Sequence, residues 1–295
     1  MSEEIKNEKP SAAKKENKGK KKHHALRNFC IVMAVLLGIW YFNNYTLKIT
    51  EVKLTSPKIT APVRIAVISD LHAAHHGISN KRIVRKIEET EPDIVIMLGD
   101  MYTLGSSDDK VQIAVDLAQM IIDADYPLYF VSGEHDTDEY YFDELRDIGT
   151  HVMNYEEERL DINGNKIQLL GIDNVYYSPT FDLNNAFTLD KKCYSILLAH
   201  IPNYEPFAEF GADLTLCADT HGGMIQLPFG IGPVYSNEYN MWFPQVKTDD
   251  VIYDKGLFDY EGGHMFITSG LGDNPAPVRF NNRPEVAVIE IDPES

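Results

Sequence analysis

Residues 63–100 read VRIAVISDLHAAHHGISNKRIVRKIEETEPDIVIMLGD, and this stretch decides the fold. It contains two apolar, largely β-branched runs, VRIAVIS and DIVIML, and polar residues follow each run directly. Between the runs, Ile83, Val84 and Ile87 recur at the spacing of one face of a helix. Buried strands joined by a helix form the repeating unit of a parallel sheet, so the stretch predicts an α/β fold.

The same alternation continues along the chain. Apolar residues at helical spacing predict a helix that begins at Ser107 or Asp108, and PLYFV at 127–131 predicts the next strand. The second half differs, because it contains a hairpin around an Asn163-Gly164 turn and little helix. A further helix is expected at 138–148 and further strands at 194–199, 214–218, 265–269 and 285–291. We therefore expect one α/β domain whose second half is more antiparallel.

Polar residues with metal-ligand chemistry follow five of the predicted strands. They are Asp70, His72, Asp100, Glu134, His135, Asp136, His200, Asp219 and His221. Any one of them alone is an ordinary turn or cap residue, but ligand sites of α/β sheets form outside the carboxyl ends of the strands. A set of Asp, Glu and His without Cys suits Mn, Fe or Zn. The set exceeds what one octahedral ion needs, which favours two ions that share a carboxylate.

Composition excludes several classes of protein. The chain has 295 residues, of which 44% are apolar and 24% charged, so it is neither wholly disordered nor a polytopic membrane protein. Three Cys are too few for a disulfide framework or a four-Cys zinc module. The formal net charge of −18 argues against nucleic acid as a partner, because phosphate backbones are bound by Lys and Arg.

The N-terminal region has a different character from the rest. Its first 27 residues hold nine Lys or Arg and four Glu, and residues 29–42 read FCIVMAVLLGIWYF without a charge. This run is either a signal anchor, a cleaved secretory signal or a buried core helix. We favour the anchor, because no small-residue cleavage motif follows and the run lacks a polar face. The boundaries are then a basic disordered tail at 1–24, a transmembrane segment at 25–45 and a globular domain at 46–295.

Positive charge beside a spanning segment stays in the cytoplasm. We therefore expect a single-pass protein of the cell membrane with its N-terminus inside and its globular domain outside. The small number of Cys is compatible with a bacterial envelope protein.

At the strand ends, the sequence resembles the calcineurin-like metallophosphoesterase family. Within that family it is similar to bacterial membrane-anchored phosphodiesterases. The matching motifs are Asp70-Leu71-His72, Gly99-Asp100, Gly133-Glu134-His135-Asp136, Ala199-His200 and Asp219-Thr220-His221-Gly222-Gly223, with supporting matches at 225–228, 269–272 and 283–285. The resemblance implies a four-layer α/β/β/α sandwich of two mixed sheets after the N-terminal helix. It also implies hydrolysis of a phosphodiester or phosphomonoester, and the anchor favours a lipid or envelope-polymer substrate.

The resemblance also implies roles for individual residues. One metal ion would be held by Asp70, His72, Asp100 and His221, and a second by Asp100, Glu134, His200 and Asp219. The nucleophile would be a hydroxide that bridges the ions. His135 would protonate the leaving oxygen, and Asp136 would fix the tautomer of its ring.

Two positions depart from the family pattern. Glu134 stands where the family has Asn, and Asp219 stands where it has His. Each change replaces a neutral ligand by an anionic one, so the four carboxylates would neutralise two divalent ions. The second position could then take a harder ion, support lower or altered activity, or belong to a non-catalytic surface protein that keeps the fold. We expect an active enzyme, with the degenerate metal-binding protein as the alternative.

A few other residues suggest a function less specifically. His75 and His76 could contact substrate, although an exposed loop is the simpler interpretation. For Arg279 and Arg283, phosphate binding and structural ion pairing both remain open. Trp242 and its neighbour Phe243 could touch a lipid or nucleoside, but packing within their own loop is favoured.

Overall fold

The structure is a computed structural model that describes residues 12–73, 78–173, 182–236, 239–273 and 278–294. The chain divides into two compact units, Met1–Phe42 and Asn43–Ser295, and each is described by itself. The first unit consists of most of helix α1 (Ala12–Tyr45). Within α1, the segment His23–Tyr45 has the length and composition of a helix that can cross a membrane.

Helix α1 begins within the predicted disordered tail. The predicted tail ran to residue 24, whereas the helix begins at Ala12. The reason is the local composition, AAKKENKGKKK, in which Ala, Lys and Glu are all strong helix formers. Residues 12–24 therefore continue the apolar helix toward the N-terminus.

The second unit is built on two six-stranded mixed sheets. The first sheet has the order β1 (Lys48–Ser56), β16 (Glu285–Pro293), β2 (Val63–Ile68), β3 (Ile94–Met97), β4 (Leu128–Phe130) and β5 (His151–Val152). The second has the order β14 (Gly256–Tyr260), β15 (Gly263–Ile267), β9 (Leu214–Cys217), β8 (Tyr194–Leu198), β7 (Asn165–Gly171) and β6 (Glu156–Ile162). Strands β2 to β5 are parallel, as are β7, β8 and β9, and this places their carboxyl ends at one edge of each sheet.

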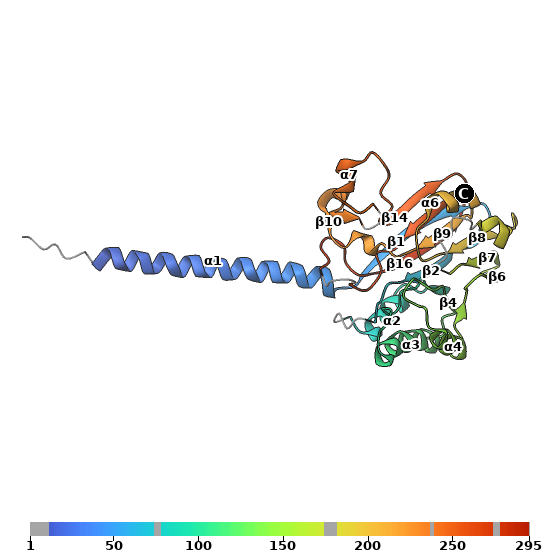
Figure 1. The fold of residues 1–295 in the computed structure, drawn as a ribbon, viewed down its shortest axis with the longest axis horizontal. Coiled ribbons are helices and arrows are strands. Elements are labelled where there is room, and N and C mark those ends of the chain that lie inside the picture. The colour runs from blue at the N-terminus through green and yellow to red at the C-terminus, as the bar shows by residue number, and fades with distance from the viewer. Residues whose placement is uncertain (1–11, 74–77, 174–181, 237–238, 274–277, 295) are drawn as a thin grey trace, which may run out of the picture. The chain divides into compact units, whose positions relative to one another are not determined.

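Helices cover the outer faces of both sheets. The first sheet packs against α2 (Asn80–Glu88), α3 (Asp108–Asp123) and α4 (Glu139–Asp147), which lie together on one side of the unit in Figure 1. The second sheet packs against α5 (Leu183–Ala186) and α6 (Tyr204–Phe210). The predicted four-layer α/β/β/α sandwich is confirmed.

Strand β2 shows why the central strands are mostly apolar. Val63, Ile65 and Val67 point into the core between the two sheets. The alternate residues Ala66 and Ile68 point into the core beneath the helices. Because successive side chains of a strand point to opposite faces, a strand between two cores is apolar wherever both faces are covered. The exception in β2 is Arg64, which is only partly buried and pairs with Glu290.

A compact segment of short elements follows β9. It contains η1 (His221–Gly223), β10 (Gln226–Leu227), η2 (Pro228–Gly230), β11 (Gly232–Pro233), β12 (Tyr235–Ser236), β13 (Met241–Trp242) and α7 (Pro244–Lys247). The strands β10 and β11 pair as one ribbon, and β12 and β13 pair as another.

Candidate metal centre

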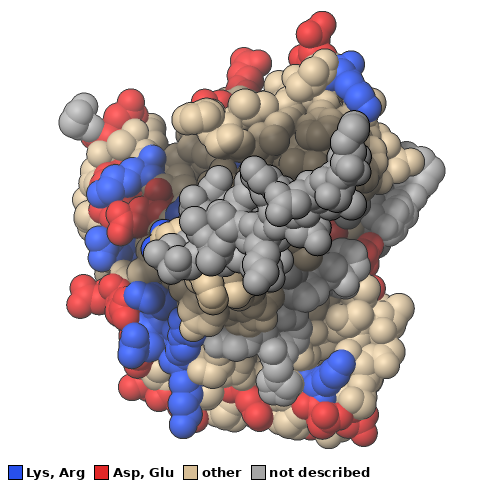
Figure 2. All heavy atoms as spheres, turned by 90° about the vertical axis from the view of Figure 1, so that its left-hand side faces the viewer, with Lys and Arg blue, Asp and Glu red and all other residues tan. Residues whose placement is uncertain are grey.

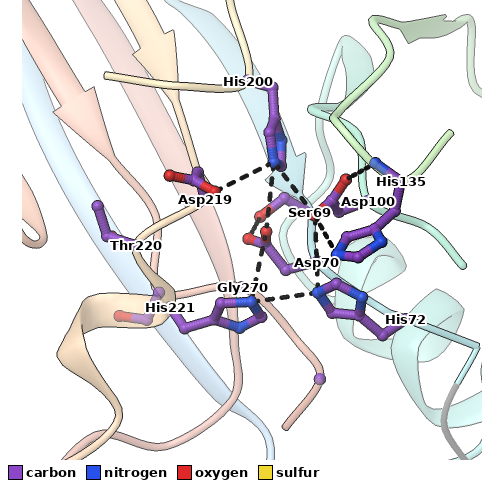
Figure 3. Close-up of polar contacts among 12 residues, drawn as sticks. Ser69, Asp70, His72, Asp100, His135, His200, Asp219, Thr220, His221 and Gly270 are labelled. Carbon is purple, nitrogen blue, oxygen red and sulfur yellow. Dashed lines mark hydrogen bonds and ion pairs between the residues drawn. The ribbon is translucent and has the colours of Figure 1, made fainter. Parts of the chain in front are cut away.

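The loops at the carboxyl ends of the strands hold their polar residues in a strained backbone conformation. Asp70, His72, Asp100, Asp219 and His221 all have left-handed φ angles, at 49°, 50°, 53°, 68° and 49°. Such angles cost of the order of 1–3 kcal/mol at a non-glycine residue and concentrate at functional sites. The strain turns these side chains toward a common space between the two sheets, where Figure 3 shows them facing one another.

Asp100 lies at the centre of the cluster. Its Oδ2 atom is 3.4 Å from His200 Nε2, 3.8 Å from His72 Nε2 and 3.9 Å from His135 Nε2. Its other oxygen, Oδ1, accepts a hydrogen bond of 2.9 Å from the His135 backbone N–H. Burial acts to raise the pKa of Asp100, but the surrounding imidazoles and hydrogen bonds outweigh it and lower the pKa to about 2. Asp100 is therefore ionised, and its Oδ2 atom faces imidazoles from both sides of the cluster.

One candidate group of donors consists of two imidazoles and a carboxylate. The Nε2 atoms of His72 and His221 are 3.1 Å apart, and His221 Nε2 is 3.9 Å from Asp70 Oδ1. Burial, Arg279 and His72 together lower the pKa of His221 well below its usual value. His221 is thus neutral and has a lone pair available for a cation. These three residues form one of the groups whose donor atoms all lie within 4.8 Å of one another.

Another candidate group of donors lies around His200. Its Nδ1–H donates to the carbonyl of Leu98 at 2.5 Å, which directs Nε2 at the cluster. Burial acts to lower the pKa of His200, but the neighbouring carboxylates of Asp100, Asp70 and Asp219 raise it well above its usual value. A cation bound here would therefore replace the proton on Nε2. Together, Asp70, Asp100 and His200 form another group within 4.8 Å. Within the described residues, the buried atoms Asp70 Oδ1 and His200 Nε2 have no hydrogen-bond partner. Carboxylate oxygens and imidazole nitrogens left in this way are the donors that a divalent transition metal takes, so the site fits such an ion.

His135 is held in a way that distinguishes it from the ligands. Its Nδ1 accepts a hydrogen bond of 3.0 Å from the backbone N–H of Leu104. A neutral imidazole that accepts at Nδ1 carries its proton on Nε2. Distance alone groups His135 with His72 and Asp100 as possible ligands. However, a protonated Nε2 has no lone pair for a metal, and this favours a role as proton donor.

Asp136 has contacts different from those that we expected. Its Oδ2 accepts from the backbone N–H groups of Asp100 and Gly133, at 2.5 and 3.0 Å, and its Oδ1 accepts from that of Met101 at 3.0 Å. Burial and the charge of Asp100 raise the pKa of Asp136 to about 7. Asp136 thus shapes the loop that carries Asp100, while the Leu104 N–H orients the His135 ring. Sequence motifs could not identify Leu104, because its contribution comes from the backbone.

The two unusual carboxylates lie at the open side of the cluster. Asp219 Oδ1 is 3.7 Å from His200 Nε2, and its side chain is 34% exposed. Glu134 Oε1 is 3.9 Å from His135 Nε2, and its side chain is 40% exposed. Burial, together with the nearby charge of Glu134, raises the pKa of Asp219 to about 6. Both carboxylates border the same space, although neither belongs to the compact donor groups found among the described residues.

Arg279 and Arg283 have structural contacts. The guanidinium of Arg279 is buried and donates to the carbonyls of Ser269 and Gly272, at 2.9 and 2.5 Å, and it pairs with Asp273. The Gly272 N–H in turn donates to the Asp70 carbonyl at 2.6 Å. Arg279 therefore stabilises the loop at 269–273, which is hydrogen-bonded to the backbone of Asp70. The Arg283 side chain donates to the backbone carbonyls of residues 46 and 47.

His151 and His264, which match no motif, lie outside the cluster. His151 pairs with Glu158 at 2.7 Å, and His264 pairs with Asp259 at 2.7 Å. His75 and His76 lie outside the described residues.

Comparison with known proteins gives a consistent result. Residues 63–223 match the family model of the calcineurin-like phosphoesterases. A metallophosphoesterase of Aquifex aeolicus is 28% identical over 278 residues, which span 88% of this chain and 97% of that protein. The uncharacterized metallophosphoesterase YkuE of Bacillus subtilis is 25% identical over 77% of this chain and 78% of its own. The phosphodiesterase YaeI of Escherichia coli is 24% identical over 78% of this chain and 83% of its own.

Proposed function

The chain belongs to the calcineurin-like phosphoesterase family and is a metal-dependent phosphoester hydrolase, and we propose that it works with two metal ions on a substrate at a membrane surface. One observation supports the pair of ions above all others. The ionised Asp100 places a single oxygen 3.4 Å from His200 Nε2 and 3.8 Å from His72 Nε2, and these two imidazoles approach from different strand ends. A shared carboxylate of this kind is typical of sites whose ions lie about 3.5–4 Å apart.

Two sets of ligands are proposed. Asp70, His72, Asp100 and His221 would hold the first ion, and Asp100, Glu134, His200 and Asp219 would hold the second. When bound, the ions would polarise the phosphoryl group and lower the pKa of the attacking water. Glu134 Oε1 lies 3.9 Å from His135 Nε2 and Asp219 Oδ1 lies 3.7 Å from His200 Nε2, so both carboxylates already face the side of the cluster where the second ion would bind.

His135 supplies the proton in this proposal. The Leu104 N–H fixes the ring so that Nε2–H points to the same side as Asp100 Oδ2. A donor at this position can reach the oxygen of a leaving group that sits over the cluster. His135 would then take a proton back from water between turnovers.

The net charge of the ligand set affects how strongly the site would bind and activate a phosphoester. With the two departures, four carboxylates face two divalent ions, so the inner shell is about neutral and attracts a phosphate less strongly than the family pattern. A harder, more highly charged ion at the second position, such as ferric iron, would restore a positive site. We propose an active enzyme whose second metal position is less positive, and therefore less active with divalent ions, than in the family pattern.

The membrane attachment is also a proposal. The apolar segment His23–Tyr45 and its Lys-rich N-terminal flank favour a signal anchor with the N-terminus in the cytoplasm. The catalytic unit would then face outward, where lipids and envelope polymers offer phosphoesters.

Hydrolysis by the detergent-solubilised full chain tests the proposed function. Bis-p-nitrophenyl phosphate and p-nitrophenyl phosphate are offered with Mn, Fe, Zn or Co, and Asp100→Ala serves as the inactive control. We expect metal-dependent turnover that the control lacks. Failure to turn over either ester with any of these metals, beside an active family member, would favour the degenerate alternative.

Reverting the departures tests the charge argument. The double variant Glu134→Asn with Asp219→His removes two negative charges from the second position. We expect turnover to rise about 10-fold or more and phosphate to inhibit more strongly. Unchanged turnover would mean that the two additional carboxylates do not lower the activity.

A further inference from the structure

An exposed apolar patch lies on the segment that follows the metal loop. It consists of Phe229, Ile231, Trp242, Phe243 and Val246, which are 97%, 49%, 59%, 41% and 74% exposed. The ribbon of β10 and β11 and the α7 region lie side by side, because the Phe243 N–H donates to Val234 O and the Val234 N–H donates to Ile225 O. Exposed aromatic residues grouped in this way are typical of an interaction surface.

The backbone adds evidence that the exposure is built into the fold. Phe229 and Phe243 have left-handed φ angles of 65° and 52°. For a bulky residue this conformation is a genuine outlier, and it costs of the order of 1–3 kcal/mol. Here the strained residues are aromatic rings that point outward. The fold thus keeps Phe229 and Phe243 in a strained conformation without gaining burial of their rings in the core. This is expected if the rings are buried against a binding partner.

The patch is tied to the place where the apolar helix ends. The side chains of Asn43 and Asn44 accept hydrogen bonds of 2.7 Å from the backbone N–H groups of Asn281 and Arg279, respectively. The same short segment bonds to β10, since the Gln226 N–H donates to Phe280 O at 2.9 Å. Residues 43 and 44 lie at the C-terminal end of the apolar segment His23–Tyr45. Chain continuity therefore brings the patch close to any bilayer that this segment enters.

A basic helix flanks the same region. Lys81, Arg82 and Arg85 are exposed on α2, and the Arg82 guanidinium donates to the Tyr45 carbonyl at 3.3 Å. Figure 2 shows Lys and Arg gathered at the lower left of this face, while much of its upper part is uncharged. In an acidic protein, basic residues and exposed aromatic residues that are both linked by hydrogen bonds to the end of the apolar segment match an anionic lipid surface.

We propose that the patch docks on the outer leaflet, with its rings in the head-group region about 5–10 Å deep and α2 against anionic head groups. The proposal rests on the proposed membrane anchor and is independent of catalysis. It gives the catalytic unit a second point of attachment, which fixes its orientation. Only two residues separate η1, which carries His221, from β10, so docking holds the metal loop close to lipid phosphoesters.

The two tryptophans of the chain make a direct test possible. Trp40 lies in the apolar segment and Trp242 in the patch, and the chain contains no other Trp. In the full chain, Trp40→Phe leaves Trp242 as the reporter and Trp242→Phe leaves Trp40. Both variants are reconstituted in vesicles of phosphatidylcholine and phosphatidylglycerol, with and without bromine on the upper acyl chains. We expect brominated lipid to quench most of the emission of Trp242.

The two reporters separate docking from anchoring. Quenching of Trp40 without quenching of Trp242 would overturn docking and keep the anchor. Loss of quenching at both Trp residues would overturn both the docking and the membrane anchor. If the emission of Trp242 is blue-shifted but is not quenched by brominated lipid, the patch binds a second copy of the chain, and the docking proposal is wrong.

A patch variant supplies the matched control. In the Trp40→Phe background, Phe229→Ser should reduce the quenching of Trp242 several-fold, since the most exposed ring of the patch is lost. Tyr140→Ser removes a ring that is 66% exposed on α4 and should leave the quenching unchanged. Thermal unfolding of each variant confirms that it is folded. Equal quenching in the two variants would contradict docking through this patch.

Discussion

The proton-donor role of His135 can be tested by replacing it with Asn. The Asn side-chain oxygen lies close to the position of Nδ1, so it can still accept the Leu104 N–H that the structure places at 3.0 Å. The variant lacks only the group at Nε2, whose proton points toward the cluster. We therefore expect the loop to keep its shape and the reaction to lose its acid.

The expected loss follows from what a positioned acid contributes. Removal of general acid catalysis lowers kcat about 10²–10⁴-fold. This corresponds to about 3–5 kcal/mol of transition-state stabilisation. The loss should be largest with a poor leaving group, such as the phenolate of a phenyl phosphodiester. It should be small with a p-nitrophenyl ester, whose leaving group departs without a proton.

The assay combines kinetics with metal content. Turnover of the two esters is compared between the wild type and His135→Asn, and bound metal is measured in both by elemental analysis. His151→Asn is the matched control, because His151 pairs with Glu158 away from the cluster. If His135→Asn loses a metal ion, His135 is a ligand and the tautomer argument is wrong. An equal loss with both leaving groups would also refute the acid role.

Three further outcomes follow from the site. Gly270→Ala would place a Cβ 2.5 Å from Asp70 Oδ2, so it should lower both metal affinity and stability. Gly105→Ala is the control, because Gly105 has a similar left-handed φ but no atom near its Cβ position, and its losses should be smaller. Calorimetry measures the stability and metal titration the affinity. In metal-free protein, burial raises the pKa values of Asp70 and Asp136 from 3.8 to about 7, so the folded state binds protons more tightly than the unfolded state. The free energy of unfolding should therefore fall as the pH rises from about 4 to about 7, and added Mn should reverse the fall in urea titrations. Arg279→Met breaks a buried ion pair behind Asp70 and should cost about 3–5 kcal/mol of stability, and a loss below about 1 kcal/mol would show that the ion pair is dispensable.

Most of the sandwich could be predicted from the sequence, because its central strands lie between two cores. The runs at 63–69 and 93–98 correspond to β2 and β3, and the Asn163-Gly164 turn joins β6 to β7 as expected. Strand β1 was not predicted, since it is an edge strand whose side chains are mostly exposed or only partly buried. Its place beside β16 depends on pairing between residues more than 200 positions apart, which no local pattern reveals.

The site was predictable in its residue types but not in its hydrogen bonds. The motifs at the strand ends named the histidines and carboxylates that the structure brings together. The left-handed backbone of these residues and the Leu104 N–H could not be read from the sequence, because both depend on how the loops cross. Asp136 shows the limit: its motif suggested a contact with His135, whereas its oxygens accept from three backbone N–H groups.

The pair of cations at Asp100 is the central claim, and anomalous X-ray diffraction from metal-loaded crystals of the full chain tests it most directly. We expect two anomalous peaks about 3.5–4 Å apart, one between the His72 and His221 rings and the other beside His200, both within reach of Asp100 Oδ2. A single peak, or two peaks too distant to share the Asp100 carboxylate, would contradict the account.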